Sequence, residues 1–386
     1  MKKDELKSDF LSELTDKYNT SRKHGAFYLY VKNKEDLSNP GDFRMIIGIS
    51  DEHLSDVAKE SLNILENKDD INDFWIDLKW KVSAYLTVQD LFGAPDFDLN
   101  DTSTIFKQWY YYYEAKYILI EAFLCGLNGF TSSVGMLLRL FLEFSLLQNY
   151  LYLKIKENRD HNSSKDFFKI THNPKWAKII NGCLPNDEFS KPIQKKLDMH
   201  LKTLSNTSTH PYKSVHSPKH SGSFLPEQTL ERLFFGYRIS IILESVLWLY
   251  YVNFPMAFHP VDIQKKFGFN FPVGRFLDEN GGMIIKKSIP KKDYNLFYKY
   301  SKKSSVIDDL MHFYNSQDDM NDAEIKSTWN AQDGEWIDSV AGHCAIMAKM
   351  RVLHEYLSLG ERANDIDDYD LSKLSLDKWR KIYKKI

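Results

Sequence analysis

The sequence is poor in cysteine, with only Cys125, Cys183 and Cys344 among its 386 residues. Cysteines that are odd in number and far apart exclude a disulfide-stapled scaffold and a cysteine-rich zinc module, and they are typical of a reducing compartment. The start of the chain, MKKDELKSDFLSEL, has no apolar stretch of the kind that a signal peptide needs. We therefore expect a cytoplasmic protein.

The chain also lacks an excess of charge of either sign. Its 51 basic and 53 acidic side chains leave a formal net charge of −2, and its isoelectric point is near 6.6. This balance excludes a histone-like protein that binds nucleic acid with its whole surface, but it leaves room for a local basic face.

Several sequence motifs of catalysis are missing. The glycine-rich patterns that hold phosphate, Gly-x-Gly-x-x-Gly and Gly-x-x-x-x-Gly-Lys-Ser/Thr, do not occur, and neither does His-Glu-x-x-His. These absences disfavour nucleotide hydrolysis and zinc-dependent proteolysis. We predict no cofactor.

Apolar and aromatic side chains, by contrast, are abundant. Hydrophobic residues make up 43% of the chain and aromatic residues 14%. This composition predicts a folded protein, and the length exceeds what one hydrophobic core usually organises. We predict a mainly α protein with a small α+β domain at residues 1–100, a helical bundle at 101–256, and a C-terminal helical region carrying a β-hairpin at 257–386.

Strand-like patterns concentrate in the first hundred residues. Residues 27–31 and 44–49 are rich in β-branched and aromatic side chains, and residues 76–88 alternate apolar with polar side chains. A period of two predicts a strand with one buried and one solvated face. Between them, residues 54–65 have the spacing of an amphipathic helix.

The pattern then becomes helical for about 150 residues. Asn128-Gly129 is a helix-stop signal between two long apolar segments. Because long helices with short connections form bundles, and because the aromatic residues concentrate here, we assign most of these rings to packing. The expected helices cover residues 109–127, 130–156, 174–182, 189–204 and 226–253.

One apolar run, residues 239–258, has about the length of a membrane span. Glu244 lies inside it, and an ionisable side chain is costly in lipid but tolerable in a protein core when it is paired. We predict a buried core helix and no membrane partner.

The remaining chain has looser patterns. Residues 273–285 predict a hairpin around Glu279-Asn-Gly-Gly282. Helices are expected at residues 293–315 and 336–359, and a basic amphipathic tail at 375–386.

Arg139 and Glu143 are four residues apart in an apolar helix, so they share a face. One interpretation is an internal salt bridge that fixes the helix register. The other is that Arg139 faces a cleft, where it binds phosphate or stabilises developing negative charge, while Glu143 orients its guanidinium.

A histidine-rich segment could complete such a site. His200, His210, His216 and His220 are four of the chain's twelve histidines. An imidazole suits proton transfer near neutral pH, so His210 or His216 beside Arg139 would activate an RNA 2′-hydroxyl without a metal. A zinc site formed by these loop histidines with Cys183 is disfavoured, because compact ligand pairs are missing.

These residues carry a family resemblance. A helix with Leu-Arg-x-x-x-Glu, followed by a bundle and a loop of the type Leu-Ser-x…His-Pro-Tyr…His, resembles the HEPN-like bundles linked to abortive infection and antiviral phage defence. The resemblance covers residues 105–255 and implies a helical bundle that pairs as a homodimer. The family's ribonuclease motif, Arg followed by His after four to six residues, does not occur here, so the resemblance supports a fold more than an activity.

A lysine-rich segment is the best candidate for nucleic-acid binding. Residues 286–303 contain seven lysines, among them Lys286, Lys287, Lys291, Lys292 and Lys299, against the single acid Asp293. Lysines neutralise phosphates, and the interleaved aromatic rings can stack on bases. The alternative is a solvated helix whose aromatic rings face inward.

The resemblance implies a defence or toxin-type protein, and with the lysine-rich segment it predicts action on RNA. A metal-independent endoribonuclease of this kind would use Arg139, Glu143, His210 and His216. The alternative is a non-catalytic sensor or scaffold, whose bundle binds a protein partner or a phage component and whose charged pair is only structural.

Overall fold

The computed structural model describes residues 40–49, 51–67, 69–88, 91, 111–157, 174–208, 229–267, 276–321 and 323–324. Over these ranges the chain is mainly α-helical, as predicted, and contains no strand. The helices are α3 (Phe43–Ile47), η1 (Asp51–His53), α4 (Asp56–Asn67), α5 (Asp69–Val88), α7 (Tyr111–Leu127), α8 (Thr131–Glu157), α10 (Trp176–Gly182), α11 (Lys191–Ser208), α13 (Thr229–Asn253), η5 (Pro255–Phe258), α14 (Ile263–Phe267), α15 (Glu279–Ser288), α16 (Lys291–Ser301) and α17 (Ser305–Asn315).

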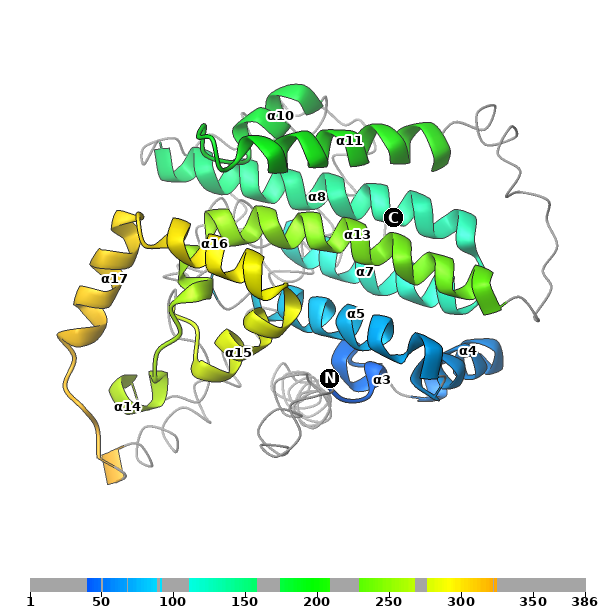
Figure 1. Cartoon of the computed structure of the whole chain (residues 1–386), viewed down its shortest axis with the longest axis horizontal. Coiled ribbons are helices and arrows are strands. Elements are labelled where there is room, and N and C mark those ends of the chain that lie inside the picture. Colours follow the sequence, from blue (N-terminus) through cyan, green and yellow to red (C-terminus); the bar gives the residue numbers. More distant parts are fainter. Residues whose placement is uncertain are drawn as a thin grey trace, which may run out of the picture.

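The long helices form a bundle in which α5, α7, α8, α11 and α13 run side by side (Figure 1). Helix α8 packs between α7 and α11, and α13 contacts all four of the other helices. One apolar core extends from Phe43 to Ile307, so elements of all three predicted regions contribute to it. The predicted boundaries between those regions stay a prediction.

The turn between α7 and α8 confirms the predicted helix stop. Gly129 has a φ of 83°, a left-handed conformation that glycine adopts without strain. The amide of Phe130 donates to the carbonyl of Cys125 at 2.8 Å, and the amide of Gly129 donates to that of Gly126 at 3.0 Å. This pair of bonds is the Schellman pattern, which satisfies the last carbonyls of α7 and reverses the chain into α8.

The predicted strand at residues 76–88 is wrong, because this segment forms most of helix α5. Its two alternating sets of side chains are both largely buried: Leu78 and Ala84 from one set, Lys79 and Tyr85 from the other, are all fully buried. A helix that is buried nearly all round has no 3.6-residue pattern to reveal it. The alternation therefore reflects composition rather than one dry and one wet face.

The predicted strand at residues 44–49 is also wrong. Residues 43–47 form the short helix α3, which buries Phe43, Ile46 and Ile47 at the i, i+3 and i+4 spacing of one helix face. Gly48, with a φ of 72°, follows the helix. The predicted strand at 27–31 lies outside the described residues.

The predicted hairpin at residues 273–285 is wrong where the structure describes it, because Glu279–Ser288 is helix α15. Asp278 caps this helix by accepting a hydrogen bond from the Gly281 amide at 2.7 Å. Gly282 allows close packing rather than a turn, since a β-carbon there would lie 2.5 Å from Cγ of Pro260.

The other predicted helices within the described residues are confirmed. The expected helix at 293–315 is divided into α16 and α17 by a turn at Lys302–Ser304. Helix α13 and η5 bury the apolar run at 239–258 inside the protein, with Leu243, Val246 and Tyr250 at 0% exposure. Across the described ranges, no helix combines the length and apolarity that a membrane crossing requires. The expected helix at 336–359 and the basic tail at 375–386 lie outside these ranges.

Aromatic side chains fill much of this core, as predicted. Tyr85, from α5, contacts Tyr112, Phe141 and Tyr250, whose ring centres lie 5.1, 5.3 and 6.0 Å away. Because these rings come from α5, α7, α8 and α13, one aromatic cluster joins four of the five helices of the bundle.

Candidate functional site

Arg139 and Glu143 form the predicted pair on α8. The Nε of Arg139 donates to Oε1 of Glu143 at 2.9 Å, and the side chains are 26% and 16% exposed. The pair is thus neither sealed in the core nor freely solvated. Met136 and Leu140, on the same face of α8, are 48% and 37% exposed, so the pair borders an apolar surface.

The predicted histidine partners of Arg139 cannot be placed beside it. His210 and His216, like His220, lie outside the described residues. His200 is described, but it belongs to another cluster: its Nε2 lies 3.0 Å from Oγ of Ser245, in the contact between α11 and α13. Of the four predicted catalytic residues, the structure therefore brings together Arg139 and Glu143.

A larger charge cluster surrounds Glu244 on α13. Lys196 of α11 lies 2.8 Å from Oε1 of Glu244, and Lys81 of α5 lies 3.3 Å from Oε2. Lys81 also pairs with Asp77 at 2.8 Å and donates to Ser240 at 3.1 Å. The carboxylate thus connects three helices through two ammonium groups.

The charges of this cluster satisfy one another. Burial alone raises the pKa of Glu244, but the hydrogen bond and charge of Lys196, together with Lys81, more than reverse this and leave the pKa below its ordinary value. Burial and the charge of Lys196 lower the pKa of His200, which favours its neutral form. We interpret the cluster as a connection between helices rather than a reactive centre, because each of its charges already has a partner.

The sequence indicated Glu244 but not its partners. Lys81 was assigned to the solvated face of a strand, although its side chain is only 9% exposed. The spacing of Asp77 and Lys81, four residues apart, is the one local signal that would have indicated a helix there.

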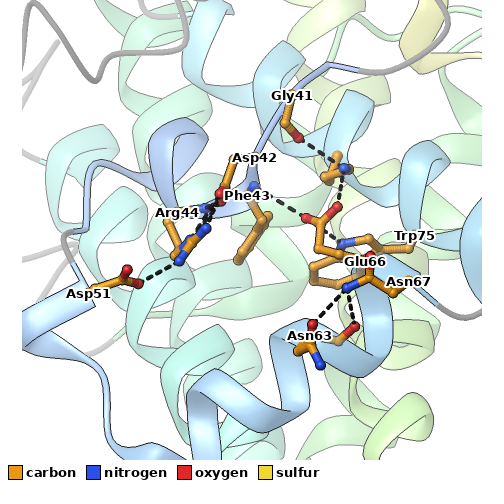
Figure 2. A network of polar contacts seen from close by, with 10 residues as sticks. Gly41, Asp42, Phe43, Arg44, Asp51, Asn63, Glu66, Asn67 and Trp75 are labelled. Atoms are coloured by element: carbon orange, nitrogen blue, oxygen red, sulfur yellow. Dashed lines mark hydrogen bonds and ion pairs between the residues drawn. The ribbon is translucent and has the colours of Figure 1, made fainter.

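A second polar network holds α3, α4 and α5 together. Figure 2 shows the Glu66 carboxylate between the Trp75 indole and the Phe43 backbone, which donate to Oε1 at 3.0 and 3.3 Å. Lys79, which is fully buried, binds Oε2 of Glu66 at 2.8 Å and the carbonyl of Gly41 at 2.9 Å. These bonds satisfy the buried lysine, so the network is structural.

The lysine-rich segment lies on α15, on α16 and in the turn after α16. All seven of its lysines are exposed, and none forms an ion pair with an acidic side chain of the described residues: Lys286, Lys287, Lys291, Lys292, Lys299, Lys302 and Lys303. We call these seven residues the basic face. It contrasts with Lys265 and Lys266 on α14, which bind Asp319 at 2.8 and 2.6 Å.

Helical spacing aligns part of the basic face. Lys292 and Lys299 lie on α16 and are seven residues apart, close to two full turns, so they share one side of the helix. At a rise of 1.5 Å per residue, they are roughly 10 Å apart along the helix axis, and Lys302 and Lys303 follow in the turn after α16. A row of unneutralised cations on a helix creates a positive potential that attracts polyanions.

Two aromatic residues between these lysines, Phe297 and Tyr300, pack against the rest of the protein. Phe297 is 3% exposed and packs on Phe258, Trp248 and Tyr251. Tyr300 stacks on Phe189 at 4.3 Å and donates its hydroxyl to Asp187 at 2.6 Å. For these two rings, the inward-facing alternative of the sequence analysis is confirmed.

No metal site emerges from the described ranges, in which no three His, Cys, Asp or Glu side chains are grouped as metal ligands. Cys183, the cysteine of the zinc alternative, is fully buried, and this burial raises the pKa of its thiol. The loop histidines of that alternative lie outside the described residues.

Comparisons with known proteins add no relative to this description: no family model, no curated protein and no solved structure matches the chain. What the protein does must therefore be argued from its own contacts, charges and exposed surfaces.

Proposed function

We propose that the protein binds and acts on RNA. The observation that carries this proposal is the basic face, seven exposed lysines within eighteen residues that have no acidic partner among the described residues. Releasing the counterions of a phosphate backbone would supply the binding free energy. Acidic side chains elsewhere keep the net charge of the chain near zero, so the attraction comes from this local cluster of lysines and not from the overall charge.

The catalytic part of the proposal concerns Arg139. In a HEPN-like defence protein, its guanidinium would stabilise the negative charge that develops at a phosphate, Glu143 would orient it, and His210 or His216 would transfer the proton. The support for this part is that Glu143 holds Nε of Arg139 at 2.9 Å while the side chain of Arg139 stays 26% exposed. Cleavage of this type would need no metal.

Binding is tested with purified full-length protein and a fluorescent RNA. Replacing Lys292, Lys299 and Lys303 by Gln should weaken RNA binding by about tenfold or more at low salt. A matched control replaces Lys175, Lys178 and Lys195, exposed lysines before and on α10 and α11, and removes the same net charge. If both triple variants bind RNA as wild type does, the basic face is not the binding site.

Cleavage is tested by incubating total RNA with wild type and with Arg139→Ala, Glu143→Gln, His210→Ala and His216→Ala. Loss of cleavage in Arg139→Ala and in one histidine variant, with folding retained by circular dichroism, is the expected result. Cleavage that Arg139→Ala retains would contradict the proposed site.

A second candidate function is a non-catalytic scaffold that pairs through α8. Met136 and Leu140 favour it, because they leave an apolar surface exposed beside the charged pair. The partner would be a second copy of the chain. Light scattering should then give a dimer for wild type and a monomer for Met136→Lys, whereas a monomeric wild type would exclude this pairing.

A further inference from the structure

We infer that the basic face recognises the phosphate backbone of a nucleic acid and not its bases. This inference rests on the proposed RNA binding and specifies its chemistry: the ligand class is any phosphodiester strand, whatever its sequence. It departs from the sequence pattern, in which lysines and aromatic rings alternate as they do in proteins that stack bases.

The exposed positions of the segment carry no stacking group. Between residues 286 and 303, the exposed side chains are the seven lysines, Pro290, Asn295 and Leu296. Stacking on a base needs the open face of an aromatic ring or of a guanidinium, and the segment contains no arginine. Lysine offers a compact charge without the planar fork that reads a base edge.

The half-buried rings already have partners within the protein. Tyr298 stacks on His259 at 5.2 Å, and the ammonium of Lys302 lies 4.5 Å from the centre of the same ring. Tyr294 packs against Phe258 at 5.2 Å. An incoming base would have to displace these contacts, whereas a phosphate reaches the lysine ammonium groups without disturbing the core.

The contacts of His259 fix the position of its own ring and of the Tyr298 ring that stacks on it. Oγ of Ser301 donates to the carbonyl of Tyr298 at 2.8 Å, so it accepts from Nε2 of His259, 2.8 Å away. This bond fastens α16 to the segment after η5, and burial together with the charge of Lys302 lowers the pKa of His259. The aromatic side of α16 is thus part of the packing.

An anionic membrane is the competing polyanion, and the packing of α16 disfavours it. Helices that lie on membranes insert a broad apolar face between lipids. The apolar face of α16 instead contacts η5 and α13, and Leu296, at 47% exposure, is the large apolar side chain that it leaves exposed. The basic face is therefore suited to phosphates held on a strand rather than to lipid insertion.

The experiment compares three fluorescent strands of equal length, oligo-uridine, oligo-adenine and an abasic phosphodiester, by anisotropy with the full chain. We expect affinities within about threefold of one another, because the strands differ only in bases. With seven lysines, the slope of log K against log salt should be no steeper than about −5. Replacing Lys292, Lys299 and Lys303 by Gln should reduce its magnitude by about two for every strand.

Each other outcome is decisive. Binding of either base-containing strand more than about tenfold tighter than the abasic strand would overturn the inference while leaving RNA binding intact. Failure of all three strands to bind would overturn the proposed function itself. Vesicles of phosphatidylserine and phosphatidylcholine, tested in parallel, would overturn the inference if they bind the protein and the strands do not.

Discussion

Glu244 accepts a hydrogen bond from Lys196 across two helices, with 2.8 Å between Oε1 and Nζ. Its other carboxylate oxygen lies 3.3 Å from the ammonium of Lys81 on a third helix. Lys196 also sits 4.5 Å from the centre of the Trp248 ring, which adds a cation–π contact to its ion pair with Glu244. One carboxylate therefore connects α5, α11 and α13, and its removal should lower the unfolding free energy of the protein.

Replacing Glu244 by Gln should destabilise the protein. The substitution keeps the shape of the side chain but leaves Lys196 and the largely buried Lys81 facing a neutral group. Breaking a buried ion pair costs about 3–5 kcal/mol, and because Glu244 is 27% exposed, solvent should reduce this to about 1–3 kcal/mol. Urea unfolding measures the change.

Glu188→Gln provides the matched control. Glu188 pairs with Lys191 at the surface, where it is 89% exposed, so its loss should cost less than about 0.5 kcal/mol. Equal effects of the two substitutions would contradict the role assigned to Glu244.

The contribution of Glu244 should depend on pH. Burial raises the pKa of this carboxyl, but Lys196 and Lys81 lower it further than burial raises it, so the folded-state pKa lies below the unfolded one. The stability that Glu244 contributes is therefore fully present above the pKa of the unfolded state, and it is lost as the pH falls through the pKa of the folded state. The difference in unfolding free energy between wild type and Glu244→Gln should stay constant from pH 7 to about pH 5 and shrink below about pH 4. A difference that persists undiminished at pH 3 would contradict this assignment.

Two glycines in facing helices should respond oppositely to alanine. A β-carbon at Gly126, on α7, would lie 2.2 Å from the ring of Phe235, which is 1% exposed and cannot swing out. Gly126→Ala should therefore cost about 1–3 kcal/mol in spite of its higher helix propensity. At Gly236, on α13, the nearest atom would be 3.4 Å away, so Gly236→Ala should be neutral or gain up to about 1 kcal/mol.

Thermal unfolding of the two variants measures both effects. A stabilising Gly126→Ala substitution would show that α7 and α13 approach each other less closely than this contact requires.

Arg139→Ala should leave the protein folded. The pair with Glu143 is an i, i+4 contact with an Arg side chain that is 26% exposed, and such pairs contribute about 0.3–0.5 kcal/mol. Packing of the alkyl stem adds to this, so we expect a loss of no more than about 1 kcal/mol in chemical denaturation. A loss above about 3 kcal/mol would identify the pair as a structural element and favour the scaffold function.

The bundle could be predicted where its signals are local. Residues 111–157 have long apolar runs with polar interruptions, and Asn128-Gly129 marks the reversal with a glycine whose φ is positive. Both signals depend on neighbours within a few residues, which spacing along the sequence records directly. The Arg139–Glu143 contact, four residues apart, was predictable for the same reason.

Helix α5 could not be predicted in this way, because its lysines are satisfied by distant residues. One of the two carboxylate partners of Lys81, Glu244, is 163 positions away, and the partner of Lys79, Glu66, belongs to the preceding helix. A lysine that alternates with apolar residues in the sequence is interpreted as solvent-exposed unless the carboxylate that pairs with it is known. The helix was therefore mistaken for a strand with one wet face.

The sequence by itself determined that the chain is mainly α, where α7 and α8 meet, and that residues 286–303 concentrate positive charge. Only the tertiary structure decided which lysines of the chain remain at the surface and which are buried. Lys79 and Lys81 lie in the interior against carboxylates of other helices, whereas the basic face has no acidic partner among the described residues. The reason is physical: periodicity records which side chains share a face, but the cost of burying a charge depends on the group that folding brings opposite it.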